Sequence, residues 1–503
     1  MPKHKEETAV LVVGGGLVGL TTALFLQQHN TPFILIEREQ AASPLPRARG
    51  WAVRSMELFR SLGLQSALEI AAKEAWEQGV FGGARRGPNM LASEALEIPS
   101  TKVLTGNDPS PCHMVACPQT AVEPILRRAL EERGGTVHFG VELLSFTQDN
   151  GGIQATIRNQ NGAEQQIDAQ FLVAADGSRG TVRRQLKIDR QSTGGGTARH
   201  YLNIFFEADL ADRMRNRTFS QCEVNNDTAS GLFLSMNNTT RWSFHLLFNP
   251  DTEQPETWSN AELTNRLHAA ICNEAAHQVP LTIHHKGTWT AVDRVADHYR
   301  DGRIFLVGDT AHIMPPWGGL NGNTGIADAH NLAWKLARAV RQANDATTEH
   351  LLASYESERR PVALRNGEQA QLRTNFEARF GIRTDANEEA VNKLRDGGEL
   401  LMRYRYGQND TVEKLEAQEG TRFPHASIEV DGKRQSTLDL FGSLNGTILA
   451  GPKATQPTPN TLQANKDFHF LDEGVTWHSL TGSSDETVIE IRPDGFVAAH
   501  HAH

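Results

Sequence analysis

Cysteine is scarce in this sequence, with four residues in 503. The four cysteines form neither a CxxC pair nor the ligand spacing of a zinc site; they are Cys112, Cys117, Cys222 and Cys272. This spacing argues against a disulfide scaffold and against a structural zinc ion, and we predict no metal site. It fits a protein of the reducing cytoplasm.

Positive charge is also in deficit. The chain has 50 basic against 60 acidic residues, a formal net charge of −10, and no run of basic residues. Because nucleic-acid binding needs a basic face, we predict no nucleic-acid partner. The sequence also has no internal repeats and no low-complexity tracts. Because 503 residues exceed what one hydrophobic core usually supports, several structural units are expected.

Long apolar runs free of glycine are absent near the N-terminus. Residues 9–26 are uncharged and follow a basic start, which superficially matches a signal peptide or a membrane span. Gly14, Gly15, Gly16 and Gly19 interrupt this stretch, and glycine weakens a helix and is poorly apolar. We therefore predict neither a targeting segment nor a membrane partner.

The same stretch has the pattern of a strand, a helix and a second strand. Residues 9–13 are apolar and β-branched, residues 17–28 have helical spacing, and residues 33–36 form a second apolar run. This order predicts one βαβ unit of a parallel sheet.

A GxGxxG motif lies in the first turn of that unit. Gly14, Gly16 and Gly19 permit a tight turn and the close approach of a pyrophosphate to the helix N-terminus. Glu37 ends the second strand, where an acidic residue can bind a ribose hydroxyl, and Arg38 follows it. We predict that these residues bind a dinucleotide.

Two further motifs follow apolar, strand-like runs. Asp176-Gly177 closes the first run, and Gly308-Asp309 closes the second, before Pro315-Pro316 and a glycine-rich loop. A carboxylate at the end of a strand can bind sugar hydroxyls, and N–H groups at a helix start can meet a ring system. We expect the helix after this loop to run from about Asp328 to Gln342.

Between these motifs, the sequence predicts antiparallel strands at residues 201–207 and 242–248. In the second strand, Trp242, Phe244, Leu246 and Phe248 alternate onto one face. The interior of a sheet is the favoured interpretation of this stripe, and a direct substrate wall is the alternative.

The three motifs in this order resemble the para-hydroxybenzoate hydroxylase class (group A) of FAD-dependent aromatic monooxygenases. The likeness covers most of residues 8–365, including residues 46–50 (Pro-Arg-Ala-Arg-Gly), 117–119 (Cys-Pro-Gln) and 303–307. It implies that FAD and NAD(P)H are the cofactors and that Asp176 and Gly177 serve both. It also implies an FAD-binding role for a set of further residues, namely Arg49, Gln119, Gly308, Asp309, Pro316, Gly319, Gly322, Asn323 and Thr324.

Within this class, residues 322–326 and 328–335 look most similar to hydroxylases of aromatic polyketides. The implied fold is α/β. It has an FAD-binding Rossmann-like (GR2-type) domain (1–185 plus 286–395), an inserted mixed β-sheet substrate-binding domain (186–285) and a C-terminal thioredoxin-like domain (396–503). Residues 422–425 and 492–496 match the usual ends of the last domain. Because no cysteine follows Cys272, that domain cannot carry out dithiol chemistry.

Two positions depart from the family pattern. Asn321 stands where the family loop usually has a glycine, so we expect Asn321 to adopt a positive φ. Thr120-Ala121 stands where relatives often carry an arginine, which puts one FAD or substrate contact in question.

The resemblance implies a reaction in which NAD(P)H reduces FAD and O2 forms a flavin C4a-hydroperoxide that hydroxylates a phenolic or polycyclic, polyketide-like aromatic substrate. The N–H groups of residues 322–325 are expected to stabilise the reduced flavin. No catalytic base is assigned, because His113, His138, His245, His284 and His285 are each more typical of surface or packed histidines.

The partners predicted are a small aromatic substrate and O2, and the chain is expected to be a monomer or a homodimer. Two alternatives stay open at this stage. One is a Baeyer-Villiger or epoxidising monooxygenase on the same fold, and the other is a non-catalytic flavin-binding protein.

Overall fold

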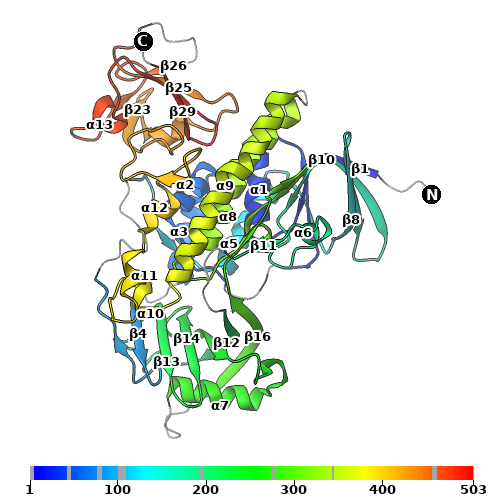
Figure 1. Cartoon of the computed structure of the whole chain (residues 1–503), viewed down its shortest axis with the longest axis vertical. Coiled ribbons are helices and arrows are strands. Elements are labelled where there is room, and N and C mark those ends of the chain that lie inside the picture. The colour runs from blue at the N-terminus through cyan, green and yellow to red at the C-terminus, as the bar shows by residue number, and fades with distance from the viewer. Residues whose placement is uncertain are drawn as a thin grey trace.

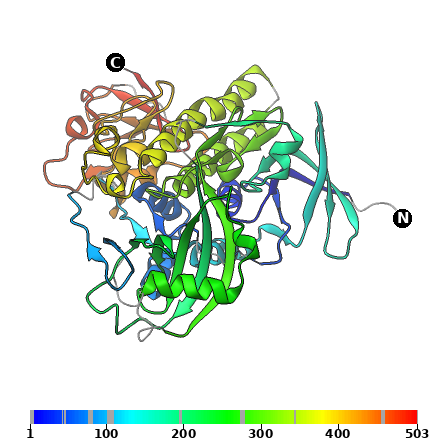
Figure 2. The ribbon, with the colours of Figure 1, turned by 60° about the horizontal axis from the view of Figure 1, so that its bottom comes forward.

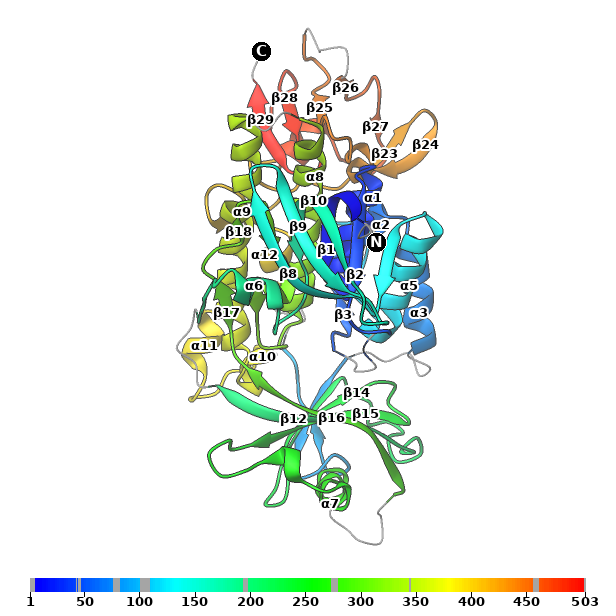
Figure 3. The same ribbon diagram turned by 90° about the vertical axis from the view of Figure 1, so that its right-hand side faces the viewer.

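The computed structural model describes residues 5–41, 43, 47–75, 82–99, 109–192, 198–272, 279–342, 345–455 and 461–501. Pro46, in the motif around Arg49, lies outside these residues. A central sheet with helices, a second sheet and a C-terminal unit make up the molecule (Figure 1). Figure 3 shows the second sheet and the C-terminal unit at opposite ends.

The central sheet has the strand order β18-β19-β10-β1-β2-β7. These strands span Arg300–Asp301 (β18), Ile304–Leu306 (β19), Glu164–Ala174 (β10), Lys5–Val13 (β1), Phe33–Glu37 (β2) and Thr136–Phe139 (β7). β1 pairs in parallel with both β2 and β10, and β10 pairs in parallel with β19. The hairpin of β8 (Glu142–Asp149) and β9 (Gly152–Arg158) extends the sheet from β10.

The predicted βαβ unit is confirmed. Helix α1 (Leu17–Gln28) joins β1 to β2, so the uncharged stretch at residues 9–26 is a strand and a helix of the domain interior. Across the described part of the chain, every helix is too short or too polar to span a membrane.

Two long helices, α8 (Leu320–Arg341) and α9 (Ala346–Leu372), cover the central sheet together with α1. α8 begins at Leu320 and not near Asp328 as expected. The left-handed turn before it is taken by Gly318 (φ 84°) and Gly319 (φ 65°), so Asn321 lies in the first helical turn. The expectation of a positive φ at Asn321 is therefore wrong.

The second sheet has the order β16-β12-β15-β14-β13-β4-β5. Its strands are Leu281–Ala291 (β16), Arg199–Ala208 (β12), Arg241–Phe248 (β15), Ser230–Ser235 (β14), Gln221–Asn225 (β13), Ala84–Gly87 (β4) and Glu94–Ala95 (β5). β4 joins through a parallel pairing with β13, and it comes from a part of the chain more than a hundred residues earlier. The short polar run Ala84–Gly87 carries no sequence signal for this pairing.

Helix α7 (Asn260–Ile271) covers one face of the second sheet (Figure 2). Trp242, Phe244 and Leu246 are buried there with Leu263 and Leu267 of α7. These three stripe residues therefore belong to the interior of the sheet. The residues between them face the other side, where the cavity described below lies.

The C-terminal unit contains a sheet of order β26-β25-β28-β29, formed by Thr461–Gln463, Thr447–Ala450, Val488–Ile491 and Val497–His501. β25 is parallel to β26 and antiparallel to β28, which agrees with a thioredoxin-like sheet. A second sheet of order β24-β23-β27 (Lys433–Ser436, Ser427–Val430, His469–Phe470) and helix α13 (Trp477–Thr481) complete the unit.

Buried ion pairs join this unit to the helices of the central domain. Arg422 forms a two-point contact with Glu57, and Arg492 Nη1 lies 2.6 Å from Glu358 Oε1. Lys335 Nζ lies 2.8 Å from the other oxygen of Glu358. The two sequence motifs that mark the ends of the unit thus provide the contacts that dock it.

Shorter helices and strands connect these parts: α2 (Val53–Ser61), α3 (Gln65–Ala75), α5 (Gln119–Glu132), α6 (Thr181–Gln185), α10 (Phe376–Arg379), α11 (Glu388–Asn392), α12 (Gly397–Leu401), η3 (Gly308–Thr310), β3 (Gly50–Trp51), β6 (Val115–Ala116), β11 (Arg190–Gln191), β17 (Arg294–Ala296) and β20 (His312–Ile313).

Candidate functional site

A cavity of about 2150 Å³ lies between the carboxyl ends of the central strands and the second sheet. Pockets for one drug-sized ligand measure roughly 300–1,000 Å³, so this cavity has room for more than one molecule. The predicted residues that line it are Gly14, Gly16, Glu37, Arg38, Arg49, Gln119, Asp176, Gly177, Asp309, Pro316, Gly319, Gly322 and Asn323. Gly19, Gly308 and Thr324 lie behind its wall.

The start of α1 forms a cradle at one end of the cavity. Gly14 has φ 112°, and a Cβ atom there would lie 2.3 Å from the carbonyl oxygen of Ala175. At Gly19 a Cβ atom would lie 1.9 Å from the oxygen of Gly14, so this glycine allows the helix to pack against the turn. Among the described residues, the N–H groups of Gly16 and Val18 have no hydrogen-bond acceptor. Open N–H groups at a helix start suit a pyrophosphate.

Two carboxylates flank this cradle. Glu37 accepts from the N–H of Gly15 at 2.6 Å and from that of Glu39 at 2.8 Å, and each oxygen can still accept from a ribose hydroxyl. Glu123, which sequence reasoning did not select, accepts from the Leu17 N–H at 2.9 Å. Burial raises the pKa of Glu123, which favours its neutral form beside an anionic ligand.

Gln119 and Arg49 both lie in the cavity wall, but their side chains are engaged by the protein. Gln119 Nε2 donates to Glu123 at 2.7 Å, and its Oε1 accepts from the Ala48 N–H at 3.3 Å. The Arg49 guanidinium donates to the carbonyl oxygens of Ser235 and Ser220, so it connects the central domain to the second sheet.

The Asp176 carboxylate connects the second motif to the third. It accepts from the Val182 N–H at the start of α6 and from Thr310 Oγ1, both at 3.0 Å. The Gly177 N–H in turn donates to Thr310 Oγ1 at 3.0 Å. The two loops therefore form one rigid edge of the cavity.

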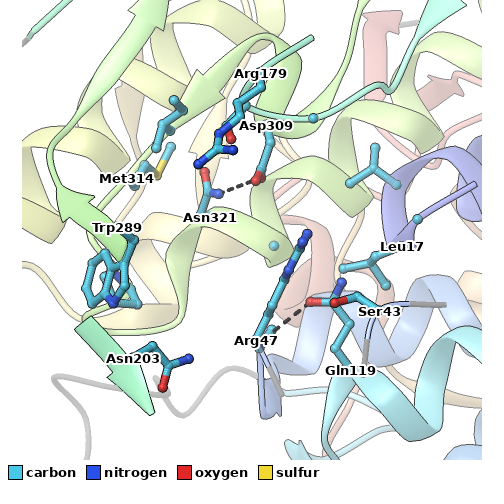
Figure 4. A pocket seen from close by; sticks show the side chains of 18 of the residues that line it. Leu17, Ser43, Arg47, Gln119, Arg179, Asn203, Trp289, Asp309, Met314 and Asn321 are labelled. Carbon is cyan, nitrogen blue, oxygen red and sulfur yellow. Dashed lines mark hydrogen bonds between the residues drawn. The ribbon is translucent and has the colours of Figure 1, made fainter. Parts of the chain in front are cut away.

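Asp309, the predicted ligand of sugar hydroxyls, is oriented by Asn321. The Asn321 amide donates to Asp309 Oδ1 at 2.8 Å, as Figure 4 shows. Its own oxygen faces His312 Nδ1 at 2.8 Å, and His312 Nε2 faces Asp328 Oδ2 at 2.7 Å. Both ring nitrogens of His312 therefore face oxygen atoms of neighbouring side chains. His312 is thus a structural, hydrogen-bonding residue next to the Gly308-Asp309 motif.

Behind His312, Asp328 also binds Arg359, whose Nε lies 2.7 Å from Asp328 Oδ1. Burial alone would raise the pKa of Asp328, but Arg359 and His312 hold it below its usual value. All three side chains are fully buried. Asp309 is thus held by a charged network that extends into the protein interior.

The first turn of α8 is fixed by its own side chains. Asn323 Oδ1 accepts from the Ala52 N–H and from Ser55 Oγ, and its amide nitrogen donates to Gly50 and Gly319. Thr324 Oγ1 donates to the carbonyl oxygen of Leu320. These side chains are therefore used within the protein, and a ligand meets this turn through its backbone.

Two aromatic side chains, Trp289 and Trp317, line the cavity on the second-sheet side and belong to a larger aromatic cluster. Tyr201 and Trp289 stack with ring centroids 4.8 Å apart, and Trp317 meets both edge-on at 6.3 and 6.2 Å. The Arg379 guanidinium covers Trp317 at 3.9 Å. Sequence reasoning missed these residues because they come from three separate segments that meet only in the fold.

Of the five histidines considered as bases, His245 and His285 line the cavity. His245 is buried, and its burial, with the nearby charge of Arg49, lowers its pKa to about 3. It is therefore neutral at physiological pH and poorly suited to remove a phenolic proton.

A dinucleotide cradle that opens into a second, aromatic-walled space defines a flavoprotein that acts on a bound organic substrate. A family model described as FAD binding domain matches residues 7–370. The chain is 33% identical to tetracenomycin A2 monooxygenase-dioxygenase of Streptomyces glaucescens, over 98% of this chain and 93% of the relative.

Two further comparisons agree. The chain is 31% identical to 4-methyl-5-nitrocatechol 5-monooxygenase of a Burkholderia species, over 98% of this chain and 94% of the relative. The solved structure of aklavinone-11 hydroxylase with FAD and aklavinone superposes with a TM-score of 0.86 at 29% identity, covering 99% of this chain and 96% of the other.

The chain belongs to the family of FAD-dependent aromatic monooxygenases. It is an enzyme, and its cofactor is FAD, as the resemblance implied.

Proposed function

We propose that this enzyme uses NAD(P)H and O2 to hydroxylate a polycyclic, phenolic aromatic substrate of the polyketide kind. The observation that carries the proposal is the continuity of one cavity of about 2150 Å³ from the α1 cradle to the aromatic wall at Trp289. A single space of this size can hold a dinucleotide and a substrate of several rings side by side.

In this proposal the three motifs hold FAD. The open N–H groups at the start of α1 bind the pyrophosphate, Glu37 binds the ribose, and Asp309 binds the ribityl hydroxyls. Bound FAD supplies the redox chemistry, taking electrons from NAD(P)H and delivering one oxygen atom of O2 to the substrate.

The chain's own part in the reaction is electrostatics and water exclusion. The N-terminal turn of α8 ends the cavity beside Asp309, where its helix dipole favours negative charge on a ring system. Trp289 and Trp317 contribute apolar surface to the opposite wall, which limits the access of water to the reacting atoms.

The relatives leave the size of the substrate open, since one is named for a polyketide and another for a nitrocatechol. Two observations favour the larger substrate. The cavity of about 2150 Å³ has room for a dinucleotide and a substrate of several rings, and the Trp289 indole in its wall offers a flat apolar surface that suits a fused ring system.

The test is product analysis of the purified FAD-loaded protein with isotopically labelled O2, NADH or NADPH, and a panel of mono- and polycyclic phenols. We expect label in a hydroxylated polycyclic product and NAD(P)H consumption that depends on it. Coupled oxygenation of small phenols alone would contradict the proposal, and label in a lactone or an epoxide would assign the alternative chemistry.

A further inference from the structure

A chain of four hydrogen-bonded side chains runs along the cavity face of the second sheet. The Trp289 indole N–H donates to His245 Nδ1 at 3.0 Å, and His245 Nε2 lies 3.4 Å from Ser243 Oγ. Ser243 Oγ donates to Asn203 Oδ1 at 2.6 Å. These residues come from β16, β15 and β12, and the chain ends at Asn203.

The direction of the hydrogen bonds along this row of side chains follows from which groups can donate and which can accept. An indole nitrogen only donates, so His245 Nδ1 accepts and the proton of the neutral ring lies on Nε2. That N–H points to Ser243, whose own proton goes to the Asn203 oxygen. Every donor therefore points toward Asn203, and a chain of this kind polarises its last member.

Asn203 is half-buried, and its amide nitrogen is free to act on the cavity. Its oxygen is taken by Ser243, whereas its nitrogen has no hydrogen-bond partner within the ranges that the structure describes. Figure 4 shows this nitrogen on the side of the open cavity.

The strand beside Asn203 leaves space for a ligand. Gly287 of β16 is its direct neighbour across the sheet, and a Cβ atom there would meet nothing nearer than His285 Nε2 at 3.7 Å. A glycine inside a strand often marks a place where another molecule approaches the backbone closely.

We propose that Asn203 is a specificity-determining residue whose amide N–H groups bind the oxygen of a ring carbonyl on an aromatic substrate lying beside Gly287. This inference rests on the proposed function and narrows its substrate class to planar aromatic molecules that carry such an oxygen. Trp289, His245 and Ser243 act as positioning residues that orient the Asn203 amide.

Binding to the FAD-loaded protein, without NAD(P)H, tests the inference apart from turnover. The two probes are a hydroxyanthraquinone and the matching hydroxyanthracene, which has the same phenol but no ring carbonyl. Their dissociation constants follow from the perturbation of the flavin spectrum. We expect Asn203→Leu to weaken hydroxyanthraquinone binding roughly tenfold, as for the loss of one buried hydrogen bond, and to leave hydroxyanthracene unchanged.

Three further variants separate recognition from general damage. Asn203→Asp keeps the shape of the side chain but replaces the N–H donors by an acceptor oxygen. The affinity for hydroxyanthraquinone should therefore fall at least as far as in Asn203→Leu. Trp289→Phe keeps an aromatic ring beside Tyr201 but removes the indole N–H together with part of the wall, so we expect a loss that is larger for hydroxyanthraquinone than for hydroxyanthracene. Gly287→Val fills the adjacent space and should weaken both probes.

The control is Thr282→Val, at the exposed end of β16, which should change neither constant. Equal losses of both probes in the two Asn203 variants, or no loss of hydroxyanthraquinone, would overturn the inference while leaving the proposed function standing. If the wild-type protein binds neither probe and oxygenates no polycyclic phenol, the proposed function fails, and the inference fails with it.

Discussion

Asn321 connects Asp309 to the buried charges behind the cavity wall, because its amide donates to Asp309 and its oxygen accepts from His312. Asn321→Gly removes this orienting donor. We expect FAD affinity to fall roughly tenfold, and to fall further in Asp309→Ala, since a hydrogen bond to a charged group contributes about 1.5–3 kcal/mol. Fluorescence titration of the apoprotein with FAD measures both losses.

The double variant shows whether Asn321 acts through Asp309. If it does, Asn321→Gly should cost nothing further once Asp309 is alanine, because the two residues share one interaction. Losses that simply add in the double variant would speak against the positioning role.

His245 should make the stability of the protein depend on acidic pH. Its pKa is lowered to about 3 in the folded protein by burial and Arg49, whereas an unfolded histidine titrates near 6.5. Between these values the unfolded chain binds the extra proton, so stability is full above about pH 6.5 and is lost as the pH falls toward 3.

Thermal unfolding at a series of pH values measures this effect. In His245→Gln the unfolding temperature should fall less steeply between pH 6.5 and 4 than in the wild type. The fall that remains reports other groups, such as His29, whose pKa is also lowered by burial. Identical pH profiles of the two proteins would show that His245 is not held neutral by the fold.

At the scale of single elements, the start of α8 depends on the conformation of Gly319. Its φ of 65° lies in the left-handed region, which costs a residue with a Cβ atom roughly 1–2 kcal/mol. Gly319→Ala should therefore lower the free energy of unfolding by about that amount in denaturant titrations of the apoprotein. Gly322→Ala, three residues later inside the helix, is the matched control and should not destabilise, because alanine favours a helix.

The elements around the FAD site were largely predictable because their signals are local. Residues 9–37 contain the glycines, the apolar runs and Glu37 in one continuous stretch, and the structure places them as one βαβ unit. The start of α8 differs from the prediction because four glycines lie close together at positions 318, 319, 322 and 325, and only packing decides which of them takes the left-handed turn.

The substrate wall could not be predicted for a different reason. Asn203 and His245 are directly opposite each other across two strands that lie about forty residues apart in the chain. Their pairing depends on the register of the sheet, and a shift by one residue would turn both away from the cavity. The pairing of β4 with β13 is equally non-local.

For the whole molecule, Glu358 is the central residue of the docking contact with the C-terminal unit. Burial would raise its pKa, but Lys335 and Arg492 lower it to about 2, so it is charged at neutral pH. Glu358→Gln leaves the buried Lys335 cation without its carboxylate and removes one of the two carboxylates that bind Arg492, the other being Asp494. We expect a loss of about 3–5 kcal/mol in the free energy of unfolding.

Calorimetry of the full chain tests this expectation. The control is Glu389→Gln, which breaks an exposed pair with Lys393 and should leave the unfolding temperature unchanged. If both variants unfold at the wild-type temperature, the docking contact contributes little to stability.

The order of strands in the central sheet also constrains how the chain can fold while it is being made. β10 ends at Ala174, but its neighbour β19 begins only at Ile304, after the whole second sheet has been synthesised. At about 5–20 residues per second, a nascent chain spends roughly 7–26 seconds with that edge of β10 unpaired. During this interval the edge can pair with another chain. Slow translation or crowded ribosomes should therefore lower the yield of active enzyme before Asp309 and the rest of the third motif have left the ribosome.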